Sequence, residues 1–145
     1  FVIQWHALAM FGPSFFTGSL IKKFGVLRII FFGIVLNIVG MASNLAGTEL
    51  INFWFGLVAL GLGWNFMFIG GTALLTETYR QSEQAKAQGA NDFLVFATIS
   101  VATFSSGALQ NVFGWAAVNG AATVPLTAAL IAILWLTAQQ RRSIP

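Results

Sequence analysis

The sequence has 145 residues, of which 57% are hydrophobic and only 8% are charged. A soluble domain carries about a quarter charged residues, so this chain cannot cover a surface that faces water. The net charge of +3 does not indicate nucleic-acid binding, because the basic residues lie between apolar segments and form no basic face. The absence of cysteine excludes disulfides and thiolate metal sites, and a single histidine argues against a histidine-built metal centre.

A helix needs about 20 apolar residues to cross the roughly 30 Å hydrocarbon core of a bilayer. The sequence contains five such stretches and little else, which predicts an all-α polytopic membrane helix bundle. The first stretch begins at Phe1 without an initiator Met, a basic leader or a cleavage site, so we expect a chain cut from something longer and no signal peptide. The expected spans are residues 1–21, 26–43, 50–74, 92–112 and 115–138.

Prolines and polar residues predict where these spans bend and begin. Gly12 and Pro13 break the first span in its middle, and Pro125 lies inside the fifth. Because proline removes a backbone donor, we expect bends at both places. The longest polar connection, residues 76–91, is expected to be a surface loop with a short helix. Asp92 follows it and is placed to cap the amides of the fourth span.

The basic residues predict the orientation of the chain. Cytoplasmic connections near span ends are enriched in Lys and Arg, and here every basic residue falls on alternate connections. We therefore expect the chain to begin outside and to end inside, with Trp5, Trp54 and Trp115 near the outer ends of their spans. The basic residues are Lys22, Lys23, Arg28, Arg80, Lys86, Arg141 and Arg142.

Small and polar residues at helical spacing predict the faces where the spans pack, since membrane helices associate through close backbones and polar contacts. The alternative is that these stripes line an aqueous pathway. The stripes are Gly33, Asn37 and Gly40 in the second span; Asn52, Gly56 and Gly63 in the third; Thr98, Ala102, Ser105 and Ser106 in the fourth; and Gly120, Ala121 and Val124 in the fifth.

Four polar side chains within the spans are candidates for a substrate pathway. His6 is the only ionisable residue clearly inside a span, about 22 Å above the inner end of its helix. Such a residue could contact substrate or handle protons, with Gln4 nearby, or it could be a neutral structural histidine. Asn65 and Asn37 are the other candidates, with ordinary packing as the alternative. No Asp or Glu lies deep in a span, and no catalytic constellation is present.

The junction of the first two spans carries a short motif. Residues 18–28 are GSLIKKFGVLR, which resembles the cytoplasmic signature G-x-L-x-x-[RK]-x-G-x-x-[RK] of the major facilitator superfamily. Lys22 stands where the strong form of that signature has Asp, and this departure favours the weaker form between the family's eighth and ninth helices. The matching glycines and bases are Gly18, Lys23, Gly25 and Arg28.

The resemblance implies that residues 1–145 are most of a carboxyl-terminal transporter half, with spans similar to helices eight to twelve. The predicted direction of the first span agrees with this numbering, because an even-numbered helix of that family runs from outside to inside. Alternating access would then involve a missing amino-terminal half of the same polypeptide. In the family, Glu77, Asp92, Lys23 and Arg28 would form a cytoplasmic charge network at the inner gate, and solvated loop charges are the alternative.

The main functional hypothesis is a secondary active transporter, either a permease or an exporter, for a small organic solute. We expect it in the plasma membrane, as in a bacterial inner membrane, with the lipid bilayer, the partner half and the solute as partners and a coupling proton as an open candidate. No cofactor, metal or enzyme activity is expected. One alternative is a non-transporting assembly or accessory module. Another is an intramembrane enzyme using His6, which lacks a second catalytic group at its depth.

Overall fold

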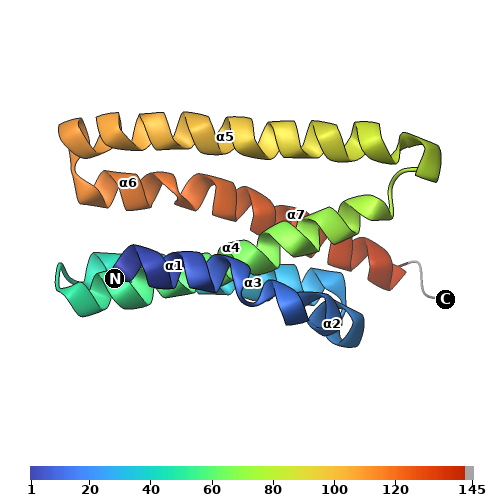
Figure 1. Cartoon of the computed structure of the whole chain (residues 1–145), viewed down its shortest axis with the longest axis horizontal. Coiled ribbons are helices and arrows are strands. Elements are labelled where there is room, and N and C mark those ends of the chain that lie inside the picture. Colours follow the sequence, from blue (N-terminus) through green and yellow to red (C-terminus); the bar gives the residue numbers. More distant parts are fainter. Residues whose placement is uncertain (143–145) are drawn as a thin grey trace.

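The computed structural model of the chain describes residues 1–142, and this part contains helices and no strands (Figure 1). Four helical stretches in it, residues 26–46, 50–76, 81–113 and 115–142, are long and apolar enough to cross a membrane. The predicted all-α membrane helix bundle is thereby confirmed. The elements are α1 (Val2–Phe11), α2 (Ser14–Phe24), α3 (Val26–Ala46), α4 (Leu50–Thr76), the 3-10 helix η1 (Gln81–Glu83), α5 (Gln84–Phe113), α6 (Trp115–Ala121) and α7 (Thr123–Arg142).

The first and last predicted spans are each divided into two helices. Gly12 and Pro13 separate α1 from α2, as predicted, because Pro13 has no N–H to continue the helical hydrogen bonds. The last span is interrupted at Ala122, between α6 and α7. Pro125 follows three residues later and cannot donate to the carbonyl of Ala121, which explains the position of this second break.

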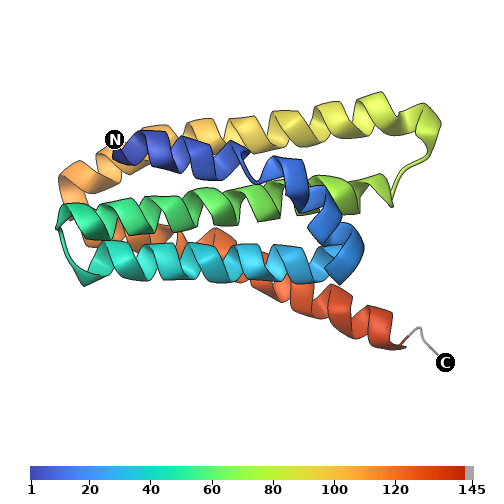
Figure 2. The same ribbon diagram turned by 60° about the horizontal axis from the view of Figure 1, so that its bottom comes forward.

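The connections between helices alternate between the two ends of the bundle (Figures 1 and 2). The N-terminus lies at the same end as the α3–α4 and α5–α6 turns. The α2–α3 turn, the α4–α5 connection and the end of α7 lie at the other end. Because all basic residues lie on or beside these last three segments, the structure gathers them at one end of the molecule. The two tightest turns contain Gly25 and Gly114, whose φ angles of 89° and 79° favour glycine.

The most extensive helix contact is the seam between α3 and α4, where glycines of each helix face the backbone of the other. A Cβ atom added to Gly33 would lie 2.8 Å from the carbonyl oxygen of Gly63. One added to Gly40 would lie 2.7 Å from the carbonyl oxygen of Gly56. Such distances leave no room for a side chain, so the glycines of the stripes predicted in the second and third spans form a packing face.

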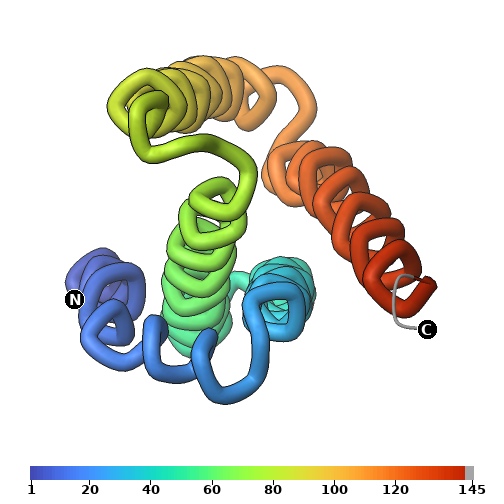
Figure 3. The backbone as a smooth tube through the Cα atoms, turned by 90° about the vertical axis from the view of Figure 1, so that its right-hand side faces the viewer, coloured from blue at the N-terminus to red at the C-terminus, as the bar shows by residue number. Residues whose placement is uncertain are grey.

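Helix α5 packs differently from its prediction. None of its residues is buried, and Thr98, Ala102 and Ser105 of the predicted packing stripe are exposed. The Thr98 hydroxyl instead donates to its own helix, to the Leu94 carbonyl at 2.7 Å. In Figure 3, α1 and α3 lie on one side of α4 and α5 lies on the other side. Helix α5 is therefore not enclosed by these three helices. The described residues therefore do not bury this stripe, and the alternative given for it, the lining of an aqueous pathway, stays a prediction.

Two helix boundaries also differ from prediction. Helix α5 begins at Gln84, so Asp92 lies within it and does not cap its start. The residues before Asp92 are good helix formers such as Gln, Ala and Lys, which extend the helix beyond its apolar part. Helix α3 continues to Ala46, past the predicted end at residue 43, and this extension places Asn44 inside the helix and buried.

Candidate functional site

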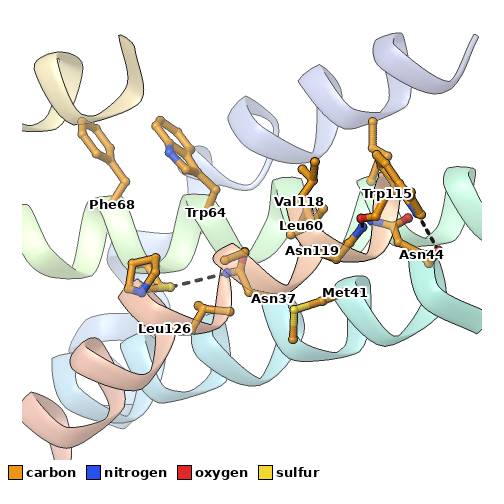
Figure 4. A pocket seen from close by; sticks show the side chains of 14 residues that line it. Asn37, Met41, Asn44, Leu60, Trp64, Phe68, Trp115, Val118, Asn119 and Leu126 are labelled. Atoms are coloured by element: carbon orange, nitrogen blue, oxygen red, sulfur yellow. Dashed lines mark hydrogen bonds between the residues drawn. The ribbon is translucent and has the colours of Figure 1, made fainter. Parts of the chain in front are cut away.

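A cavity of about 550 Å³ lies between α3, α4, α6 and α7 (Figure 4). Its walls are mainly apolar and aromatic, none of its lining residues is charged, and three asparagines contribute amide groups to it. Small-molecule sites commonly have this size and this mixture of apolar walls with a few polar groups. The lining residues are Asn37, Met41, Asn44, Leu57, Leu60, Trp64, Met67, Phe68, Trp115, Val118, Asn119, Ala122, Pro125 and Leu126.

Trp115 holds one end of this cavity together. Its indole nitrogen donates to the backbone carbonyl of Asn44 at 2.9 Å, which joins the start of α6 to the end of α3. Its ring also meets the Phe53 ring edge-on, with centroids 5.5 Å apart. One turn along α6, the buried Asn119 donates from Nδ2 to the Trp115 carbonyl at 3.0 Å. These contacts fix the Asn119 amide beside the cavity.

The other two asparagines of the cavity come from α3. Asn37 and Asn44 are seven residues apart, and this spacing puts them on the same face of the helix. Asn37 donates from Nδ2 to the Gly33 carbonyl at 2.8 Å and contacts Met67 Sδ at 3.4 Å. Asn44 is only 3% exposed, and its Oδ1 has no hydrogen-bond partner. A buried amide oxygen without a partner is energetically unfavourable, so Asn44 is the least satisfied polar group of the site.

Two stacked rings of α4 complete the cavity wall. Trp64 and Phe68 are four residues apart, so their side chains lie on one helix face. Their ring centroids are 4.7 Å apart and their planes differ by 8°. Trp64 also meets the ring of Phe11 in α1 edge-on at 6.2 Å. The site therefore combines flat aromatic surfaces with amide groups from two neighbouring helices.

Asn65, a predicted pathway residue, lies outside this cavity and joins α4 to the break between α1 and α2. It is 1% exposed. Its Nδ2 donates to the Met10 carbonyl at 2.6 Å and to Ser14 Oγ at 2.7 Å, while its Oδ1 accepts from the Thr17 hydroxyl at 2.7 Å. The Asn65 amide thus supplies partners to backbone and hydroxyl groups beside the Gly12–Pro13 break. This arrangement matches the packing alternative given for Asn65.

His6 and Gln4 are on α1, away from the cavity lining. His6 Nδ1 lies 2.7 Å from the backbone carbonyl of Leu57 in α4. Since a carbonyl oxygen only accepts, Nδ1 is the donor of this bond. A Cβ atom at Gly61 would lie 2.6 Å from the His6 carbonyl, so the two helices cross closely here. Gln4 is exposed. Of the four pathway candidates, the structure brings only Asn37 into the cavity.

The signature and gate residues lie at the basic end of the bundle. Arg28, Glu77 and Gly25 line a second cavity of about 930 Å³, together with Arg141 of α7. Lys23 lies outside it, with Nζ 5.2 Å from the centre of the Phe24 ring. The remaining members, Gly18 and Lys22 of α2 and Asp92 of α5, do not line this cavity either. Across residues 1–142, no ion pair joins Glu77 or Asp92 to Lys23 or Arg28, and the predicted charge network stays a prediction.

Among the residues that sequence reasoning missed in the first cavity, three form the hydrogen-bonded end of it. Asn119 precedes the predicted stripe of the fifth span by one residue, and an amide in an apolar span was the signal that could have found it. Asn44 lies just beyond residue 43, where the second span was expected to end, and so was not among the candidates. Trp115 was expected only at a membrane interface. Its bond to the Asn44 carbonyl could not be foreseen, because 71 residues separate the two positions.

Long apolar helices, close glycine contacts and amides held inside an apolar bundle define an integral membrane protein of several spans. The chain is 49% identical over 117 residues to the riboflavin transporter RfnT of Brucella anthropi, a match covering 81% of this chain and 29% of that protein. It is 38% identical over 96 residues to YdeG and to YddS of Bacillus subtilis, both named as uncharacterized MFS-type transporters. Those two matches cover 65% of this chain and 22% of each relative.

These relatives confirm the predicted resemblance, and the chain is a homologue of MFS-type transporters over most of its length. It spans less than a third of the length of each of these relatives. No family model matches the chain. No solved structure matches it significantly either.

Proposed function

We propose that this chain is part of a secondary active transporter for a small organic solute, and that riboflavin is the first substrate to test. The observation that carries the proposal is the 49% identity to the riboflavin transporter of Brucella anthropi over 81% of this chain. The size of the cavity between α3, α4, α6 and α7 supports it, since about 550 Å³ suits a small molecule.

The chain is proposed to supply five spans of a carboxyl-terminal half, and the rest of the polypeptide supplies the amino-terminal half. The signature at the α2–α3 turn supports this assignment, because Lys22 replaces the Asp of the strong form. The coverage of less than a third of each relative agrees with a chain that needs a partner half. Transport then proceeds by rocking of the two halves around a site near the midplane of the bilayer.

The basic end of the bundle is proposed to face the cytoplasm in the plasma membrane. All seven Lys and Arg residues lie at that end, and cytoplasmic connections are enriched in such residues. Arg28 and Glu77 share the cavity at this end, which supports a role for them in the inner gate. In the proposed cycle, their pairing with Lys23 and Asp92 would form in one state and break in the other.

Uptake of labelled riboflavin tests the proposal. The whole protein is reconstituted into liposomes, and uptake is compared with protein-free liposomes, with and without an imposed proton gradient. Protein-dependent uptake that saturates with riboflavin concentration is expected, and stimulation by the gradient would identify the proton as the coupling ion. The matched variants are Arg28→Gln, which should lower the rate, and Arg142→Gln, a basic residue outside the cavity, which should not.

Absence of riboflavin uptake at every gradient would remove riboflavin as the substrate. A panel of small organic solutes would follow, and failure of all of them would favour the non-transporting module.

A further inference from the structure

We propose that the cavity between α3, α4, α6 and α7 binds an uncharged, planar heteroaromatic ring with neighbouring N–H and C=O groups. This inference rests on the proposed function, because it assigns the solute class to a particular place in the bundle. The cavity volume of about 550 Å³ accommodates a fused two- or three-ring system.

The lining favours an uncharged ligand. None of the residues around the cavity is Lys, Arg, Asp, Glu or His. An ionised group moved from water into such apolar surroundings without a counter-charge is strongly disfavoured. A phosphate or carboxylate on the ligand would therefore have to remain outside the cavity, where water can reach it.

The aromatic residues favour a planar ligand. Trp64 and Phe68 are already parallel, with 8° between their planes, and Trp115 is held by its bond to the Asn44 carbonyl. Rigid aromatic faces stack on flat rings in offset or edge-on geometry. Because these rings are fixed by protein contacts, little ordering is needed when a ring enters beside them.

The asparagines favour a ligand with hydrogen-bonding groups over a lipid acyl chain. Each amide can donate twice and accept twice, yet the buried Oδ1 of Asn44 has no hydrogen-bond partner. Asn37 and Asn119 form their side-chain hydrogen bonds only through Nδ2 as donor. Oδ1 of each amide therefore accepts no hydrogen bond from the described residues. In the hydrocarbon region such groups need partners, which an acyl chain cannot provide. A ring edge that alternates N–H and C=O provides both kinds.

Equilibrium dialysis of the detergent-solubilised whole protein against dimethylalloxazine, an uncharged three-ring heterocycle with an imide edge, tests the site. The variants are Asn119→Leu and Asn37→Leu, which keep the branched shape and the number of heavy atoms and remove the amide. Each is expected to weaken binding about three- to tenfold, the value of one hydrogen bond. The matched control is Asn111→Leu at the exposed end of α5, where binding should stay within about twofold of wild type.

A ligand methylated on the imide nitrogen makes the test specific for hydrogen bonding. It should bind wild type less tightly than dimethylalloxazine does, and the difference should shrink in the variant whose amide contacts that N–H. Thermal unfolding of each variant identifies loss of binding caused by misfolding. If an asparagine variant unfolds at a lower temperature than wild type, Trp64→Phe is used in its place. This variant should weaken binding while it keeps an aromatic ring at the position.

Three results would overturn the site. Equal binding by wild type and both asparagine variants would show that the ring binds elsewhere. A failure of wild type to bind would show that the cavity does not accept this ring. Displacement of the ring by dodecanol, with no effect of the asparagine substitutions, would show an acyl-chain groove. Riboflavin uptake that persists alongside any of these results would leave the proposed function standing. Binding at the asparagines without uptake of any solute would instead support the site and contradict the transport function.

Discussion

The two parts of this bundle differ in how closely their helices approach one another. In the α1–α4 part, α3 and α4 touch through glycines, and Asn65 and Ile34 are almost completely buried. In the described residues of α5–α7, only Asn119 and Ile133 are buried. Long apolar helices make up both parts, so hydrophobicity does not explain the difference.

The comparison shows that a stripe of small residues produces close packing only where a complementary helix faces it. Gly33 and Gly40 of α3 lie opposite the carbonyls of Gly63 and Gly56 in α4, and each glycine makes room for the other helix. A Cβ atom added to Gly107 of α5 would meet no atom of another helix within 4 Å, so the same residue type has no packing role there. Five substitutions test this difference, beginning with the largest expected effect.

Gly40→Leu should lower the free energy of unfolding by about 3 kcal/mol, because a side chain there overlaps the Gly56 carbonyl and forces α3 and α4 apart. Thermal unfolding of the whole protein in detergent measures the change. Gly107→Leu on α5 is the matched control and should change stability by less than about 0.5 kcal/mol. Equal losses for the two variants would contradict the difference between the two parts.

Asn65→Leu should destabilise the protein by about 2 kcal/mol, since it removes the partner of Ser14 Oγ and of the Met10 carbonyl and leaves the Thr17 hydroxyl only its bond to the Pro13 carbonyl. Asn111→Leu serves as the exposed control. Ligand affinity measured on the folded fraction distinguishes a packing role of Asn65 from a role in the substrate pathway. Unchanged stability with lost affinity would make Asn65 a pathway residue after all.

Trp115→Phe should cost about 1 kcal/mol, the net value of its bond to the Asn44 carbonyl, while the ring contact with Phe53 is kept. Because this bond is a link between the two parts, cleavage by protease at the α5–α6 turn should become faster. Trp135→Phe, an exposed position of α7, provides the comparison. A turn that is cleaved no faster in Trp115→Phe would show that other contacts hold α6 in place.

His6→Leu should lower stability by about 0.6 kcal/mol, as is common for a single hydrogen bond between membrane helices. The pH dependence of solute uptake is the second measurement. If His6 only joins α1 to α4, the pH profile of uptake in the variant should match wild type. A profile that loses its pH dependence would show that His6 handles protons.

Ala102→Leu should have the smallest effect, below about 0.5 kcal/mol, because Ala102 of α5 is exposed. Thermal unfolding of the whole protein provides the value. A loss of several kcal/mol would show that another segment of the polypeptide packs on this face. The contrast between the two parts would then be a property of residues 1–142 alone.

Much of the fold could be predicted from the sequence because it depends on local properties. The length of apolar stretches predicts helices that can cross a bilayer, and Gly12–Pro13 predicts a break in any surroundings. The alternation of basic connections correctly predicted which turns share an end of the bundle. Asp92 was misplaced because helix-forming polar residues continue a helix beyond the apolar stretch, and apolarity alone does not define the boundary.

Whether a single asparagine lines a cavity or only joins helices could not be predicted in the same way. Asn37 and Asn65 look alike in sequence, each an amide within an apolar span, yet the structure places Asn37 at a cavity and Asn65 in a saturated hydrogen-bond network. Sequence alone determined the helices, their breaks and the basic end, since each follows from neighbouring residues. Tertiary structure alone decided which amides face the cavity, because that depends on the helix that lies opposite.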